Sequence, residues 1–70
     1  MTLQEAKVGE RIFVVAVNAP AAERKRLESL GITPGAEISV LADNGGPVLI
    51  SVDEARLAVE RELAAFVLVA

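Results

Sequence analysis

Five short segments of the chain carry apolar residues in a run or at alternate positions, and each predicts a β-strand. They cover residues 11–17, 36–43, 47–53, 55–60 and 66–70. The first of them, RIFVVAV, is apolar at every position after its arginine, which is typical of a strand covered on both faces. The barrel and the following helix can supply that cover between them, or a partner protein can supply part of it.

The second and third strands predict a hairpin, because an Asn-Gly-Gly sequence lies between them. Matching their apolar faces sets Val40 opposite Ile50 and Leu41 opposite Leu49, with a three-residue loop. The two leucines then lie side by side on the face away from Val40. Either the N-terminal turn folds Leu3 over them, or they form an exposed patch that binds another protein.

The segment NAPAAERKRLESLG, between the first two strands, predicts a helix. Pro20 suits its first turn, where a missing N–H costs nothing. Leu27 and Leu30 are three residues apart and are expected to face inward. Gly31 can end the helix in the left-handed conformation, with Ile32 folding back onto Leu27.

Three local signals fix the remaining turns. Thr2 and Glu5 have capping-box spacing, which predicts a helical turn over residues 3–6. Gly9 stands where the chain needs a positive φ. Pro34-Gly35 has the order that a type II turn requires.

The pattern as a whole predicts a mainly β fold with about five strands and one α-helix inserted after the first strand. A further helical turn is expected over residues 61–65. So many strands in 70 residues favour a small, strongly curved barrel, and closing the barrel would remove exposed strand edges. We expect residues 1–70 to form a single domain.

Composition narrows the function. The net charge is −3, from 7 basic and 10 acidic residues, whereas nucleic-acid-binding domains are normally basic. The chain has no Trp or Tyr on which bases could stack. No apolar run is long enough for membrane insertion, and the N-terminus lacks the pattern of a secretion signal. We therefore expect a cytoplasmic protein that binds no nucleic acid.

The side chains offer little chemistry. Without His or Cys, the chain lacks the common general base and the common transition-metal ligands. We expect no catalytic residues, no metal site and no cofactor. Carboxylates remain at Asp53 and Glu54 and at Glu60 and Glu62, and they form either a solvated surface or a weak site for a hard divalent cation.

The only basic cluster is Arg24, Lys25 and Arg26, on the predicted helix. These side chains fan around the helix instead of forming one row. The cluster is either an ordinary exposed helix face or a surface that binds an acidic partner.

Three pieces of the sequence, in this order and spacing, resemble the FeoA family, ferrous iron transport protein A. They are TLQEAKVGE, RLESLGITPGAEISVL and RLAVERELAAFVLV, and together they span essentially the whole chain. The residues that match the family pattern are Gly9, Glu10, Leu27, Leu30, Gly31, Pro34, Gly35, Arg56, Leu57 and Ala58. Where the family often has a glycine just before the Arg-hydrophobic-Ala segment, this chain has Asp53-Glu54.

The resemblance implies an SH3-like β-barrel and a small cytoplasmic protein. It implies a partner as well: a membrane ferrous iron transporter with a GTP-binding cytoplasmic domain. A related domain occurs at the C-terminus of metal-dependent repressors of the diphtheria-toxin-repressor type.

The resulting hypothesis is a non-enzymatic accessory protein of ferrous iron uptake that acts by protein–protein contact. Its expected contact residues are Arg24, Lys25, Arg26, Leu41 and Leu49. Two alternatives stay open: a small barrel that associates with itself as a homo-oligomer, and a weak carboxylate-based module that binds a divalent transition metal.

Overall fold

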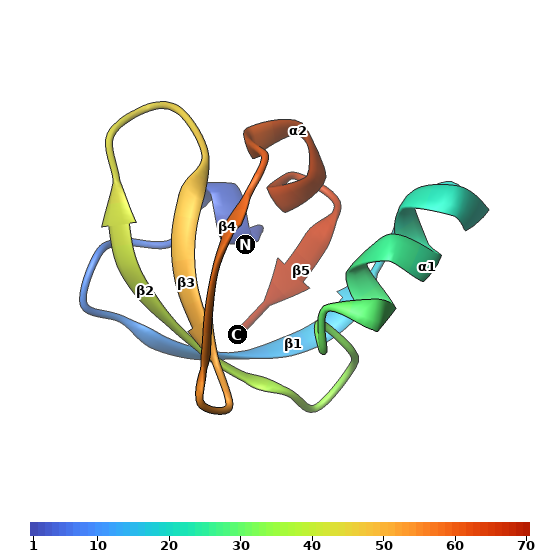
Figure 1. Cartoon of the computed structure of the whole chain (residues 1–70), viewed down its shortest axis with the longest axis horizontal. Helices are drawn as coiled ribbons and strands as arrows, with labels where there is room; N and C mark the ends of the chain where they lie inside the picture. Colours follow the sequence, from blue (N-terminus) through green and yellow to red (C-terminus); the bar gives the residue numbers. More distant parts are fainter.

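Five strands form one antiparallel sheet in the computed structural model, which describes residues 1–70 (Figure 1). The strands are β1 (Arg11–Val17), β2 (Glu37–Asp43), β3 (Val48–Val52), β4 (Ala55–Val59) and β5 (Val67–Val69), in the order β4-β3-β2-β1-β5. The helices are the 3-10 turn η1 (Leu3–Glu5), α1 (Ala21–Ser29) and α2 (Arg61–Ala64). A small barrel of five strands, with a helix inserted after the first, is thus confirmed.

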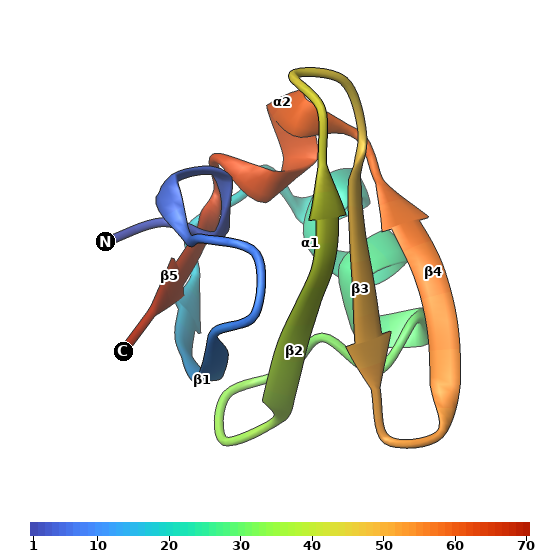
Figure 2. The same cartoon turned by 90° about the vertical axis from the view of Figure 1, so that its left-hand side faces the viewer.

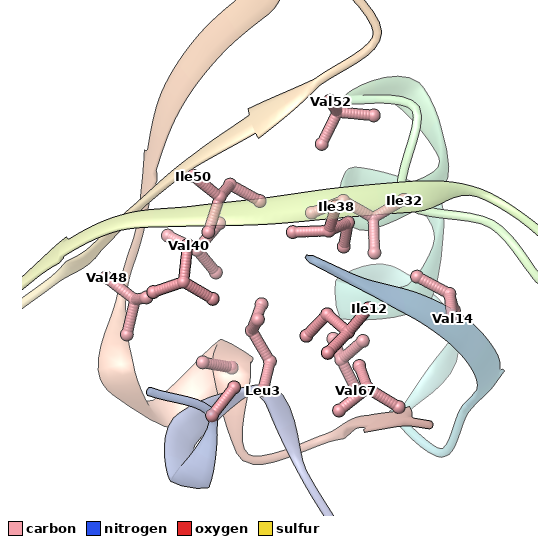
Figure 3. Packing of buried hydrophobic residues seen from close by; sticks show 14 of the residues in the cluster. Leu3, Ile12, Val14, Ile32, Ile38, Val40, Val48, Ile50, Val52 and Val67 are labelled. Carbon is pink, nitrogen blue, oxygen red and sulfur yellow. The ribbon is translucent and has the colours of Figure 1, made fainter. Parts of the chain in front are cut away.

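The sheet curves around a core that is entirely apolar. Sixteen residues are buried and none of them is polar or charged. Leu3 of η1 is fully buried and lies among the inner-face side chains of β1 and β2 (Figure 3). The first alternative for the hairpin leucines is therefore wrong, because Leu3 fills the barrel interior and does not cover the outer face. The core residues are Leu3, Ala6, Ile12, Val14, Leu27, Ile32, Ile38, Val40, Val48, Ile50, Val52, Val59, Leu63, Ala64, Val67 and Val69.

The strand β1 is buried on one face only, so the barrel and the helix do not cover both faces, and cover by a partner protein stays a prediction. Ile12 and Val14 are each 3% exposed, whereas Phe13 is 52% and Val15 is 55% exposed. The physical reason is the curvature of the sheet, which encloses side chains on its concave side. The helix that follows β1 does not return over the convex side.

The helix α1 buries a single side chain against the barrel. Pro20 is its N-cap, one position before the expected first turn, and Leu27 is its only buried residue. Leu30 is 38% exposed, so the expectation that it faces inward is wrong. Leu30 occupies the C-cap, where the chain already turns away to re-enter the sheet.

The end of α1 has the predicted glycine cap. Gly31 has a φ of +88°. Its N–H donates to the Glu28 carbonyl at 3.0 Å, and the Ile32 N–H donates to the Leu27 carbonyl at 3.0 Å. These are the two hydrogen bonds of a Schellman motif. Both Leu27 and Ile32 are fully buried, so the cap fixes the helix and the start of the next segment together.

The next turn is also as expected. Gly35 has a φ of +90°, and the Ala36 N–H donates to the Thr33 carbonyl at 2.9 Å. This agrees with a type II turn, which places a glycine at its third residue. Gly9 has a positive φ as well, of +93°.

The hairpin of β2 and β3 departs from the predicted register near its loop. Val40 does face Ile50, but the register then shifts and Ala42, not Leu41, pairs with Leu49. Leu41 is the extra residue of a β-bulge, which increases the local twist. The loop therefore has four residues, Asn44–Pro47, instead of the expected three.

The two edges of the sheet differ, because β4 and β5 do not pair and the barrel is not closed by hydrogen bonds. The outer edge of β5 is occupied by the N-terminus: Thr2 bridges to Leu68, and the Val69 N–H donates to the Met1 carbonyl at 2.9 Å. In contrast, β4 pairs only with β3 and is the last strand on its side of the sheet (Figure 2). The expectation that closure removes every edge is therefore wrong at β4.

The turn between β3 and β4 shows how the chain bends without a glycine. Only Asp53 and Glu54 separate the two strands. Asp53 has a φ of +54°, and no other residue except glycine has a positive φ. Aspartate tolerates the left-handed region better than most residues do, and it replaces the glycine in this position.

Candidate functional site

The basic cluster is exposed along α1, but two of its three cations already have acidic neighbours. Arg24 Nε lies 4.0 Å from Glu28 Oε1 within the helix. Arg26 Nη2 lies 3.3 Å from Glu60 Oε1, next to the end of β4. Lys25 takes part in no ion pair and is exposed. Exposed pairs of this kind hold their partners weakly, so all three cations remain available to an acidic ligand.

The hairpin leucines do lie together on the outer face, although by a different route from the one predicted. The bulge places Leu41 next to Ala42, which faces Leu49, and Ala58 of β4 faces Leu49 from the other side. Leu41 is 36% and Leu49 is 37% exposed. The result is a small apolar area across three strands, which we call the hairpin patch and define as Leu41, Leu49 and Ala58.

A second apolar area lies on the outer face of β1, outside the expected contact residues. Phe13 and Val15 of β1 are the most exposed large apolar side chains of any strand. Phe13 faces Glu37 of β2 on one side, and its N–H and carbonyl pair with Ala70 on the other. The signal was present in RIFVVAV, because a strand that is apolar on both faces must leave one face uncovered if the sheet is a single curved layer.

The hairpin loop is held in place by Arg61, a residue that no sequence pattern indicated as functional. The Nη2 of Arg61 contacts the Asp43 carboxylate. Its Nε donates to the carbonyls of Gly45 at 2.9 Å and Gly46 at 3.0 Å. Asp43 also accepts a hydrogen bond from the Gly45 N–H at 3.1 Å. The loop therefore has a defined shape beside the hairpin patch.

A shallow hollow of about 550 Å³ lies beside this contact, between the hairpin loop, η1 and α2. Only one of its eight lining residues is hydrophobic, and the lining includes Gln4, Glu60, Arg61 and Glu62. The guanidinium of Arg61 is already committed to the loop, and the two glutamates add negative charge. The hollow therefore offers neither an anion site nor an apolar pocket.

The carboxylates do not gather into a cluster. The chain contains no group of three or more His, Cys, Asp or Glu that could hold a metal ion. Glu37 and Asp53 line one small hollow on the outer face with Ser39 and Ser51, and Glu37 is paired with Arg11 at 3.3 Å. Of the carboxylates considered in the sequence, Glu60 is turned toward Arg26.

One acidic residue has a perturbed ionisation. The Thr2 N–H donates to Glu5 Oε1 at 2.7 Å, and the Thr2 hydroxyl donates to the same oxygen at 3.2 Å. These hydrogen bonds, the backbone one first, lower the pKa of Glu5. The pair closes the capping box of η1, so its role is to hold the N-terminus at the barrel.

No helix of the chain is both long and apolar enough to cross a membrane.

Comparison with known proteins identifies relatives along the whole chain. The family model described as the FeoA domain matches residues 1–70. A protein of Methanocaldococcus jannaschii that is assigned as an Fe(2+) transport protein A is 36% identical over 64 residues, which cover 91% of this chain and 78% of that protein.

Solved structures agree. An iron uptake regulatory protein, FeoA, has a TM-score of 0.94 at 38% identity, covering 99% of this chain and 93% of that chain. The zinc complex of FeoA from Stenotrophomonas maltophilia, described as an SH3 domain protein, has a TM-score of 0.89 at 32% identity, covering 100% and 89%. A manganese-dependent transcriptional repressor shares the fold alone, with a TM-score of 0.90 at 20% identity over 35% of its length.

Proposed function

The chain belongs to the FeoA family, and from that premise we propose that it is a non-enzymatic, cytoplasmic accessory protein of ferrous iron uptake. Its partner is the cytoplasmic part of a membrane ferrous iron transporter, with the GTP-binding domain as the first candidate. It acts by binding that partner and not by chemistry of its own.

One observation carries the proposal: every buried side chain is apolar, while large apolar side chains remain on the outer face. An interior without a polar group holds no reactive or ligating residue. The outer face, in contrast, exposes Leu41 and Leu49 on the hairpin, close to a loop that Arg61 holds in shape. Exposed apolar groups on an otherwise ordered small domain are typical of protein-binding surfaces.

The charge distribution adds a second contact area. Arg24, Lys25 and Arg26 are exposed on a helix whose only buried residue is Leu27. Cations on a protruding element steer association with an acidic surface and make its rate sensitive to salt. We therefore assign the hairpin patch to affinity and the α1 cations to orientation of the complex.

The proposal is tested by an amide NMR titration of the labelled protein with the isolated transporter domain. Localised shifts are expected at the hairpin patch and at residues 24–26. The double variant L41D/L49D is expected to keep a folded spectrum and to lose binding, because it places two charges in the apolar contact.

The matched control is F13D/V15D, which makes the same two apolar-to-acidic changes on β1 of the same face. It is expected to bind as the wild type does. Equal binding by L41D/L49D would remove the hairpin patch from the site, and an absence of shifts at near-saturating partner would reject the partner itself.

A further inference from the structure

The edge of β4 presents unused backbone hydrogen-bonding groups. A two-residue turn makes Val52 and Ala55 a hydrogen-bonded pair, and the bonds then alternate along the ladder. Ala55, Leu57 and Val59 thus bond to β3, whereas the N–H and carbonyl groups of Arg56 and Ala58 point away from the sheet. No strand lies on that side (Figure 2).

The free edge continues one residue beyond the strand. Glu60 has a φ of −54° and a ψ of 140°, so its backbone is still extended. Its N–H donates no hydrogen bond, whereas its carbonyl accepts one from the Ala64 N–H within α2. The unused N–H donors of the edge therefore run from Arg56 to Glu60, whereas its unused carbonyls end at Ala58.

We propose that this edge pairs, antiparallel, with the same edge of a second copy of the chain. The sequence of the edge, RLAVE, is complementary to itself when it is reversed about Ala58. Arg56 then faces Glu60 of the second copy, Leu57 faces Val59 of the second copy, and the two Ala58 residues face each other. The sheet becomes continuous across a two-fold axis.

Both faces of the paired strands are compatible with this register. Arg56 and Glu60 lie on the outer face, where two opposite-charge pairs form at once. Leu57 lies on the inner face and packs against the core while remaining partly exposed. Val59 of the second copy, which is buried in its own core, lies opposite Leu57 on the same face, so no polar group is set against either side chain. The two alanines at the centre leave room for close backbone approach.

The charges of the edge favour a second copy over an unrelated strand. Arg56 takes part in no ion pair within the chain. Glu60 is held beside the edge by Arg26, which contacts only its Oε1. Arg56 and Glu60 lie on the same edge, two positions on either side of Ala58. A two-fold rotation about Ala58 therefore sets Arg56 of each copy opposite Glu60 of the other. Centring the pair on Leu57 would instead set Glu54 against Glu60, two like charges.

The experiment uses sedimentation equilibrium of the full chain over a micromolar to millimolar concentration series. The wild type is expected to show a monomer–dimer equilibrium. R56E alone places acid against acid, and E60R alone places base against base, so each is expected to weaken the dimer by roughly tenfold or more because two pairs reverse at once. An equimolar mixture of the two variants restores both pairs and is expected to associate as the wild type does.

A second pair of variants tests the backbone bonds. A58P removes the outward N–H at the centre without touching a bond to β3, and proline is tolerated at such edges. It is expected to be folded and monomeric, whereas A58S, which keeps the N–H, is expected to dimerise. Amide NMR spectra confirm the fold of each variant.

Three outcomes would overturn the proposal. They are a wild type that stays monomeric throughout the series, a mixture of R56E and E60R that fails to associate, and a dimer that survives A58P. The last would place self-association on another surface, such as the hairpin patch.

Discussion

Arg61 of α2 is paired with Asp43 at the end of β2, although the two residues are 18 positions apart in the chain. The same guanidinium donates to the carbonyls of Gly45 and Gly46. One side chain therefore fixes both the end of the strand and the loop that follows it. In a four-residue loop with two glycines, this contact offsets much of the conformational freedom that the sequence allows.

Replacing Arg61 with Lys is expected to loosen the hairpin loop. Lysine keeps the positive charge but lacks the planar fork that reaches a carboxylate and two carbonyls together. We expect the free energy of unfolding to fall by about 1–2 kcal/mol and the amides of residues 44–46 to exchange faster. Denaturant unfolding and hydrogen exchange measure the two effects. The control R24K alters an exposed pair and is expected to change stability by less than about 0.5 kcal/mol; equal losses in the two variants would contradict a special role for Arg61.

The attachment of α1 is tested by truncating its two leucines separately. Leu27 is fully buried, so Leu27→Ala is expected to cost about 2–5 kcal/mol of unfolding free energy. Leu30 is 38% exposed, and Leu30→Ala is expected to cost under about 1 kcal/mol. Thermal or denaturant unfolding of the two variants gives the comparison. Similar losses would mean that both leucines support the helix.

The positive φ of Asp53 predicts opposite changes in stability for two substitutions at this position. Asp53→Gly removes the steric cost of the left-handed conformation and is expected to leave stability unchanged or to raise it by up to about 1 kcal/mol. Asp53→Val is expected to lower it by about 1–2 kcal/mol, because a β-branched residue fits this region poorly. Glu54→Val, at the neighbouring turn position without a positive φ, serves as the control. A Glu54→Val loss as large as that of Asp53→Val would show that turn polarity and not φ is decisive.

The capping box of η1 predicts a dependence of stability on pH. Hydrogen bonds from Thr2 lower the pKa of Glu5 in the folded chain, relative to about 4.3 for an unfolded glutamate. The contribution of Glu5 is therefore present above that value and is lost as the pH falls through the lower, folded pKa. The wild type is expected to be more stable than Glu5→Gln at neutral pH, and the difference is expected to vanish in acid. Unfolding midpoints of both proteins across this range measure it, and a constant difference would exclude the carboxylate as its source.

The local signals in the sequence predicted the turns well, because each depends on only a few neighbouring residues. Gly31 and Gly35 need a positive φ, which few other residues accept, and the structure has both. The resemblance to the FeoA family supplied the barrel type. The Asn-Gly-Gly sequence predicted the pairing of β2 with β3, whereas the order of the five strands in the sheet came from the structure.

The details that the sequence could not supply depend on the curvature of the sheet. Apolar side chains such as Phe13 and Leu30 suggest burial, but the inner volume was already filled by the other face of β1 and by Leu27. The bulge at Leu41 likewise depends on how β2 must twist to enclose the core. Arg61 was missed for a similar reason, since its partners come together only once α2 has folded against the hairpin.

The sequence predicted which residues are exposed at the candidate contact areas better than it predicted how these residues are arranged. The exposure of Arg24, Lys25 and Arg26 follows from their charge on a short helix. The adjacency of Leu41 and Leu49 followed from hairpin pairing, and the bulge preserved it despite the altered register. Their role in binding a partner remains a proposal.

The helix α1 is inserted between two neighbouring strands, and this arrangement affects which residues of the domain can change during evolution. The chain leaves the sheet after β1, forms a helix held by the buried Leu27 and by the ion pair between Arg26 and Glu60, and returns as β2 beside β1. A segment that departs from and rejoins neighbouring strands can be exchanged without rewriting the rest of the barrel. The outward positions of this nine-residue helix can therefore change without disturbing the core, so relatives with the same barrel can acquire different specificities by altering a few residues of one segment.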